Sequence, residues 1–156
     1  MQHKLALLAL PFVLLAGSGA TAQAAETPAS DAPLAWTVDD PGLQWGPCPA
    51  FLPEGCAIAV LHGDPAQANA DIFFKVPAKA SIARHWHTSA ERMTLVTGEL
   101  HVTYDGQDPV ILKPGSYAYG PAMRPHQAQC QSEQACVLFI AFESAVDAHA
   151  GEPPAP

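Results

Sequence analysis

Short apolar segments that alternate with turn residues place the strongest limit on how this chain can fold. From Gly55 onward the apolar runs end at signals such as Gly63-Asp64-Pro65, Gly98-Glu99 and Lys113-Pro114-Gly115. The predicted strands are Ala57–Leu61, Asp71–Val76, Ser81–His87, Arg92–Thr97, Leu100–Tyr104, Val110–Leu112, Ser116–Tyr119, His126–Gln131 and Ala135–Phe142. No long helical period separates them, and only Pro65–Ala70 and Ser144–Ala150 are candidates for short helices. The pattern predicts an all-β sandwich or barrel.

The first 24 residues have the layout of a secretory signal peptide. Lys4 carries a positive charge, Leu5 to Ala16 is almost wholly apolar, and Ala22-Gln23-Ala24 offers small residues to a signal peptidase. We therefore expect cleavage between Ala24 and Ala25 and a periplasmic or secreted protein. An uncleaved anchor is the alternative, but the apolar run is short for a membrane span. No later segment is apolar enough to cross a bilayer, so we expect no membrane association after cleavage.

The remainder is long enough for one domain with a real core and too short for two. Residues 25–33 are rich in Ala, Pro, Ser and Thr and are expected to form a flexible leader. Residues 148–156 are expected to form a flexible tail. The folded domain is expected at residues 34–147, beginning with an irregular N-terminal arm that packs through Trp36 and Trp45.

The charge balance excludes some partners. The whole chain has 7 Lys and Arg against 15 Asp and Glu, a net charge of −8, and loss of Lys4 would change it to −9. Nucleic acids and anionic membrane surfaces attract basic patches, so neither is an expected partner. A small-molecule ligand is the expected partner instead.

The cysteines suggest disulfides, because an even number in an exported chain is typical of them. Cys48, Cys56, Cys130 and Cys136 allow three pairings, and sequence alone does not select one. We favour Cys48–Cys56 and Cys130–Cys136, since each pair flanks a polar or Pro/Gly-rich loop. A zinc site or a redox pair is the alternative, although neither pair has the C-x-x-C spacing common in such sites.

A cluster of imidazole and carboxylate side chains indicates a metal site. His85 and His87 are two residues apart, so they share one face of an extended strand. A short turn after them could bring Glu91 back beside them, and His126 from a distant strand could close the site. Imidazole and carboxylate are ligands that borderline divalent metals prefer. For an isolated H-x-H, a surface or core pair would be the simpler interpretation.

The spacing of these residues resembles that of the cupin family. The first cupin motif, G-x5-H-x-H-x3-4-E-x6-G, is matched at His85, His87, Glu91 and Gly98, with Lys79 in place of the leading Gly. The second motif, G-x5-P-x-G-x2-H-x3-N, is matched at Gly115, Pro121 and His126, with Met123 and Cys130 in place of the second Gly and the Asn. The resemblance covers roughly residues 55 to 143. Its departures fall at turn and framework positions and not at ligand positions.

The resemblance implies a double-stranded β-helix, a small jelly-roll barrel with one metal near its mouth. His85, His87, Glu91 and His126 would hold the metal and leave two octahedral positions for water, substrate or dioxygen. Family members use iron, manganese, zinc, nickel or copper, and this ligand set suits several of them. Cupins often pair through edge strands, so a homodimer is a further expectation.

Strand parity suggests which other side chains face the metal. Met93 shares the face of Glu91, and Tyr104 continues an apolar stripe, so both are candidate pocket residues. Arg124 shares the parity of His126 and could clamp a substrate carboxylate, whereas an exposed arginine is the alternative. His101 is expected on the outer face. We could name no second acid or base for catalysis.

Two functions are compatible with these residues. A metal-dependent enzyme of the dioxygenase, decarboxylase or isomerase type would act on a small anionic or phenolic substrate. The alternative is a non-catalytic exported module that binds or senses a metal or a small ligand. The fold does not decide between them, because cupins carry many chemistries.

Overall fold

The computed structural model describes residues 32–155. The predicted signal peptide and nearly all of the predicted leader lie outside these residues. Within the described part of the chain, no helix is long and apolar enough to cross a membrane. All the regular structure between Ala32 and Ala155 is β-strand, so the all-β prediction is confirmed.

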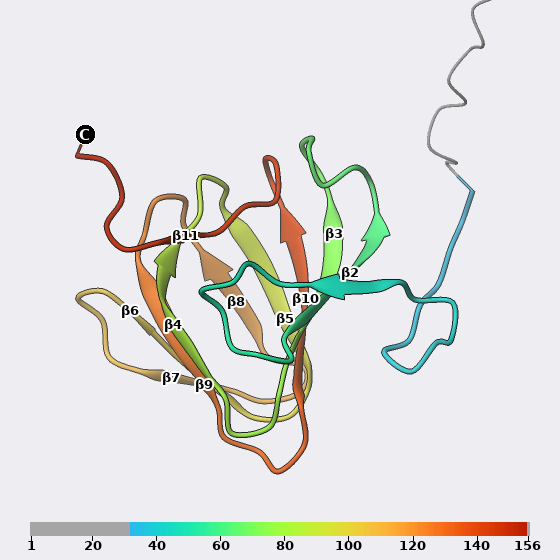
Figure 1. Ribbon diagram of the computed structural model, residues 1–156, viewed down its shortest axis with the longest axis horizontal. Coiled ribbons are helices and arrows are strands. Elements are labelled where there is room, and N and C mark those ends of the chain that lie inside the picture. The colour runs from blue at the N-terminus through green and yellow to red at the C-terminus, as the bar shows by residue number, and fades with distance from the viewer. Residues whose placement is uncertain (1–31, 156) are drawn as a thin grey trace, which may run out of the picture. The chain divides into compact units, whose positions relative to one another are not determined.

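Two antiparallel sheets make up the domain (Figure 1). The first has the strand order β1-β2-β3-β10-β5-β8, and the second has the order β11-β4-β9-β6-β7. The strands are β1 Trp45–Pro47, β2 Ala57–His62, β3 Asp71–Val76, β4 Ser81–Trp86, β5 Glu91–Thr97, β6 Leu100–Tyr104, β7 Val110–Leu112, β8 Tyr117–Gly120, β9 His126–Cys130, β10 Cys136–Phe142 and β11 His149–Ala150. Neighbours far apart in sequence, such as β3 with β10 and β4 with β9, give the double-stranded β-helix its crossovers.

The predicted strands agree with the observed ones to within one residue at each end. Two short strands, β1 and β11, were not expected. Both candidate helices are absent: residues 65–69 form turns and bends, and residues 144–150 end in β11. Residues 148–156 were predicted to form a flexible tail. Two of them, His149 and Ala150, instead pair with Trp86 and His85 on β4.

The core lies between the sheets and is built from alternate residues of their strands. Leu95 on β5 and Val76 on β3 are fully buried in the first sheet, and Leu100 on β6 is buried opposite them in the second. On β5 and β6 buried residues alternate with less buried ones, as the period of two in a strand predicts, whereas β3 has buried residues on both faces. Burial of such apolar side chains is the main favourable contribution to folding.

The N-terminal arm covers the outer face of the first sheet. Trp45 stacks on Phe73 with ring centroids 6.5 Å apart, and the Lys75 ammonium lies 3.9 Å from the centre of the Trp45 ring. Trp36 donates its indole N–H to the Leu61 carbonyl at 3.2 Å. The arm thus packs through the two tryptophans that the sequence indicated.

Two disulfides fix the ends of this scaffold. Cys48–Cys56 closes the loop that leads into β2, and Cys130–Cys136 closes the turn between β9 and β10. These are the pairs favoured from the sequence. Gly98 lies against the second bridge with φ +87°, and a Cβ there would stand 2.7 Å from the Cys136 sulfur. The hairpin between β5 and β6 therefore requires glycine at this position.

The two departures from the cupin glycine pattern keep the backbone conformation of glycine. Lys79 and Met123 both have φ 61°, in the left-handed region that side chains with a Cβ rarely adopt. The Met123 N–H donates to the His87 carbonyl at 2.8 Å, so the strained turn is tied to the strand end that carries His87. Met123 therefore adopts at this turn a backbone conformation that glycine would adopt without strain.

Replacing Met123 by glycine should stabilise the protein. The left-handed conformation costs a residue with a Cβ about 1–2 kcal/mol, and part of that gain is offset by the greater freedom of unfolded glycine. We expect Met123→Gly to raise the free energy of unfolding by about 0.5–1 kcal/mol in denaturant titrations. Met123→Ala is the matched control, because alanine keeps the Cβ and gains nothing. Equal stability of the two variants would contradict the argument.

Candidate metal centre

The two sheets bring the predicted ligands together at one end of the barrel. His85 near the end of β4 and His126 at the start of β9 are direct cross-strand partners. A register shift between Ile82 and His85 places them opposite each other, and their ring centroids are 4.2 Å apart. Such bulges often re-aim side chains at functional sites. Without the shift, residue 84 would face His126.

His87 and Glu91 lie on the segment that crosses from the second sheet to the first. His87 follows the last residue of β4, and Glu91 is the first residue of β5. Ser89, buried between them, fixes the crossover: its hydroxyl accepts the N–H groups of Glu143 and Ser144 at 3.0 and 2.9 Å. Ser89 was not predicted from the sequence, because nothing in its type or spacing distinguishes it from a turn residue.

Each histidine donates its Nδ1 proton to a main-chain carbonyl. His85 Nδ1 lies 2.8 Å from the Ala83 oxygen, His126 Nδ1 lies 3.2 Å from the Arg124 oxygen, and His87 Nδ1 is bonded to the Asp147 oxygen. A carbonyl oxygen only accepts, so the proton must be on Nδ1. This fixes the tautomer and leaves the Nε2 lone pair of each ring free for a metal.

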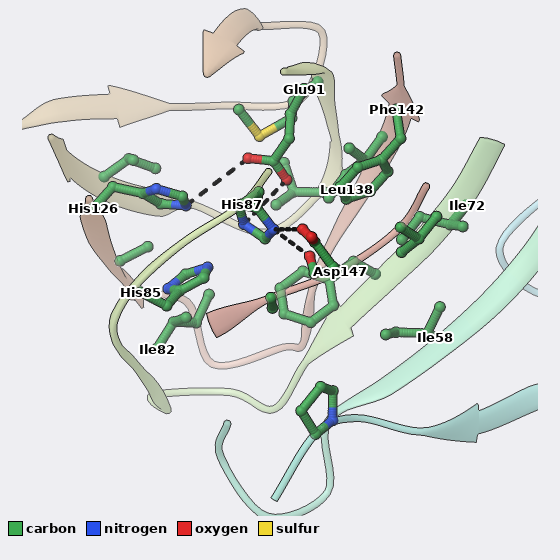
Figure 2. Close-up of a pocket in the computed structure, with 18 of the residues that line it drawn as sticks. Ile58, Ile72, Ile82, His85, His87, Glu91, His126, Leu138, Phe142 and Asp147 are labelled. Carbon is green, nitrogen blue, oxygen red and sulfur yellow. Dashed lines mark hydrogen bonds and ion pairs between the residues drawn. The ribbon is translucent and has the colours of Figure 1, made fainter. Parts of the chain in front are cut away.

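The donor atoms form a compact, buried group. One ring nitrogen from each of His85, His87 and His126 lies within 4.8 Å of the others. Glu91 is 3 % exposed, and its oxygens lie 3.5 Å from His87 Nε2 and 3.9 Å from His126 Nε2. Figure 2 shows the carboxylate beside the imidazoles, facing the same space.

Burial holds all four groups in their neutral forms in the metal-free protein. Desolvation lowers the pKa of His87 to about 4 and that of His126 to about 3, and it also lowers the pKa of His85. Desolvation, assisted by the nearby Asp147 carboxylate, raises the pKa of Glu91 to about 8. At neutral pH the imidazoles are ready to bind a metal, whereas Glu91 still carries a proton.

A C-terminal segment, residues 146–152, packs beside the site and is called the strap here. It was not predicted from the sequence. Besides accepting from His87, Asp147 accepts the Thr88 N–H at 3.0 Å and the Thr88 hydroxyl through its carboxylate. His149 stacks on Trp86 at 4.3 Å. Arg84 pairs with Glu152 at 2.8 Å and with Asp105. In Figure 1 this segment runs alongside β4.

The imidazoles open onto a cavity of about 200 Å³ between the sheets. Beyond His85, His87, Glu91 and His126 its lining is almost wholly apolar, and Val146, Asp147 and Ala148 of the strap complete it. Figure 2 shows Ile58 and Ile72 across the cavity from the histidines. The apolar lining includes Ile58, Ile72, Phe74, Ile82, Leu138 and Ile140.

The three predicted pocket residues divide into two groups. Met93 and Tyr104 line the cavity. The Tyr104 ring stacks on His126 with centroids 4.6 Å apart, and burial beside Glu91 raises the pKa of its phenol above the ordinary value. Arg124, in contrast, is exposed and donates to the Asp105 carbonyl at 2.5 Å, so the structure places it outside the cavity. The strand parity used for the prediction does not apply to Arg124, because β9 begins only at His126.

The residues present suit a divalent metal. In histidine metal sites the ligating ring commonly donates its other N–H to a carbonyl or carboxylate, and each of the three buried imidazoles here donates from Nδ1 to a carbonyl and leaves Nε2 free. The Nε2 atoms of His87 and His126 face the Glu91 carboxyl at 3.5 and 3.9 Å, beyond the length of an ordinary hydrogen bond, so they remain available to a metal. The donor set of nitrogen and carboxylate oxygen fits iron, manganese, zinc, nickel or copper.

A jelly roll of two antiparallel sheets with a buried histidine cluster at one end defines a cupin. The chain belongs to the ChrR Cupin-like domain family, whose sequence profile matches residues 35–146. No curated protein matches the chain.

Solved structures with this fold are distant in sequence. A chain from the crystal structures of the DMSP lyases RdDddP and RnDddQII superposes with a TM-score of 0.62 at 15% identity, covering 70% of this chain and 63% of that one. The polyketide cyclase RemF from Streptomyces resistomycificus gives 0.60 at 17%, covering 74% and 84%. A cupin 2 conserved barrel domain protein from Rhodopseudomonas palustris gives 0.58 at 18%, covering 73% and 79%. The chain thus spans less than two thirds of the lyase, and these similarities establish the fold alone.

Gly120 should be intolerant of a side chain. It pairs with Glu91 across β8 and β5, and a Cβ there would overlap the Tyr104 hydroxyl and stand 3.1 Å from Glu91 Oε2. We expect Gly120→Ala to lower the free energy of unfolding by about 1–3 kcal/mol in denaturant titrations. Adding Tyr104→Phe removes the overlapped oxygen and should recover part of the loss. Gly46→Ala, whose Cβ would meet only the Ile58 carbonyl at 3.9 Å, is the control. Equal losses at the two glycines would refute the packing argument.

Proposed function

We propose that this protein is a metal-dependent enzyme in which His85, His87, Glu91 and His126 hold one divalent metal. The observation that carries the proposal is the convergence of three pre-oriented imidazoles and a buried carboxyl on a cavity large enough for a small molecule. A site that only stored a metal would need no such adjoining space. Enzymes, a lyase and a cyclase among them, are found on this fold.

The residues of the chain have separate tasks in this proposal. A bound metal supplies Lewis-acid or redox chemistry at the buried end of the cavity. The carbonyls of Ala83, Arg124 and Asp147 hold the three imidazoles at fixed angles. The apolar wall positions the body of the substrate and excludes water, which strengthens electrostatic interactions at the site. The reaction would be of the dioxygenase, decarboxylase or isomerase type.

A non-catalytic metal- or ligand-binding module is the second candidate. One observation favours it. Among the described residues that line the cavity, the only side chains that could act as an acid or base are the four proposed ligands, Asp147 and Tyr104. Turnover distinguishes the two functions. The test is dioxygen uptake and product analysis with a panel of small acids and phenols, on protein loaded in turn with iron, manganese, zinc, nickel and copper. Binding without turnover under every metal would select the module.

We also propose that the mature protein is exported. The predicted signal peptide and the two disulfides support this, because disulfides persist in oxidising compartments. The mass of the protein recovered from the periplasm or medium tests it, with Ala25 as the expected first residue.

Metal affinity should increase with pH up to about 8. A metal that binds the Glu91 carboxylate must displace the proton that this buried group holds below its pKa of about 8, whereas the imidazoles are already neutral. From about pH 6 to 8 the affinity should rise about tenfold per pH unit, with about one proton released per metal in calorimetry. In Glu91→Gln the amide has no proton to lose, so binding should be weaker and nearly independent of pH. A flat profile for the wild type would argue against Glu91 as a ligand.

Removal of a ligand histidine should abolish metal retention. We expect His87→Ala, purified without an affinity tag, to lose about 100-fold or more in affinity and to show no stabilisation by added metal. His101→Ala is the control, since His101 is only half-buried and pairs with Glu99 at 3.0 Å outside the cavity. Elemental analysis and thermal unfolding measure both effects. Similar metal content in the two variants would count against the site.

A further inference from the structure

We propose that the cavity takes an uncharged, largely hydrocarbon ring that carries one oxygen donor, such as a phenol, a cyclic ketone or a cyclic alcohol. This rests on the proposed metal site, because the single oxygen is the group that would meet the metal. It keeps the phenols of the anionic or phenolic class expected from the sequence, excludes the anions of that class, and adds neutral cyclic ketones and alcohols.

Polar side chains are unevenly distributed around the cavity. Its polar side chains lie at the histidine end, where His85, His87, Glu91 and His126 converge. The opposite wall is apolar and includes Ile58 and Ile72 (Figure 2). A ligand hydroxyl facing that wall would lose its water without gaining a hydrogen bond, which is unfavourable. A polyol or sugar is therefore a poor fit, whereas a ligand with one polar end matches the wall.

The charged side chains around the cavity also bear on which ligand fits it. None of the described residues that line the cavity is Lys or Arg, and the groups there that can carry a negative charge are Glu91 and Asp147. Five cationic side chains of the described residues are engaged elsewhere: Arg84 with Asp105 and Glu152, Arg92 with Glu143, Lys79 with Glu133, Lys75 over Trp45 and Arg124 on the Asp105 carbonyl. Lys113 is exposed and does not line the cavity. A carboxylate bound to the metal would share the cavity with the Asp147 carboxylate and would have no Lys or Arg side chain to pair with. The charge pattern thus favours an uncharged ligand.

The volume of the cavity limits the size of the ligand. An engineered apolar cavity of about 150 Å³ accepts benzene. The cavity here, of about 200 Å³, has room for a six-membered ring with a short substituent. Larger fused rings would require movement of core side chains, because Ile72 and Ile140 on the wall are 2 % and 5 % exposed and packed in the core.

Ligand preference can be measured on the full chain, with and without Co²⁺. The probes are phenol, cyclohexanone, benzoate and glucose, titrated by calorimetry, and the visible absorption of Co²⁺ reports ligands that reach the metal. We expect phenol and cyclohexanone to bind about tenfold or more tightly than benzoate in both forms, and glucose not to bind. A preference for benzoate or glucose in either form, or no binding of the neutral rings, would overturn this inference. Failure to bind Co²⁺ would instead overturn the proposed function.

A wall variant tests whether these probes occupy this cavity. Ile72→Ala removes side-chain volume from the apolar wall and so enlarges the cavity. The affinity for 4-propylphenol relative to phenol should therefore increase about fivefold or more. Ile72→Val removes less volume and should shift the ratio in the same direction by less, and it serves if the alanine variant does not fold. Val60→Ala on β2 is the control, because Val60 is 43 % exposed and does not line the cavity. An unchanged ratio in the folded Ile72 variants would show that the rings bind elsewhere.

Discussion

The hydrogen bonds from imidazole Nδ1 to main-chain carbonyls determine what this end of the barrel can do. For His85 and His126 the acceptor is the carbonyl two residues earlier on the same chain segment. For His87 the acceptor is Asp147, 60 residues away on the C-terminal strap. Two ligands are therefore oriented by local backbone geometry, whereas the third depends on tertiary structure. The strap therefore orients one histidine of the candidate metal centre and also forms part of the cavity lining.

This dependence explains why the strap is fastened at several points. Asp147 accepts from Thr88 with its carboxylate, His149 stacks on Trp86, and Glu152 pairs with Arg84. Individually, exposed ion pairs contribute little to stability. Together with the pairing of β11 to β4 they hold one backbone carbonyl in place. A side-chain acceptor for His87 could rotate, whereas a carbonyl held by a paired strand moves only with the segment.

The sequence predicted the strands and the convergence of His85, His87 and Glu91 because both follow from local patterns. His126 was predicted from the resemblance of its surroundings to the second cupin motif. Alternation within strands has a period of two, and the histidine and glutamate spacing marks one strand-turn-strand unit. It did not predict the bulge that sets His85 opposite His126, because register shifts depend on both paired strands. Ser89 and the strap were missed because their acceptors and donors are distant in the chain. Arg124 was misplaced because parity holds only inside a strand, and β9 begins after it.

The apolar wall has two roles that constrain each other. Ile72, Ile82 and Leu138 line the cavity and also belong to the main hydrophobic core. A substitution that reshapes the cavity therefore removes core packing as well, at a cost of about 2–5 kcal/mol for a large-to-small change. The polar end of the cavity is less tied to core packing, because its residues lie at strand ends and on the crossover. Substitutions that change which ligand the cavity accepts should therefore cost more stability than substitutions at the polar end.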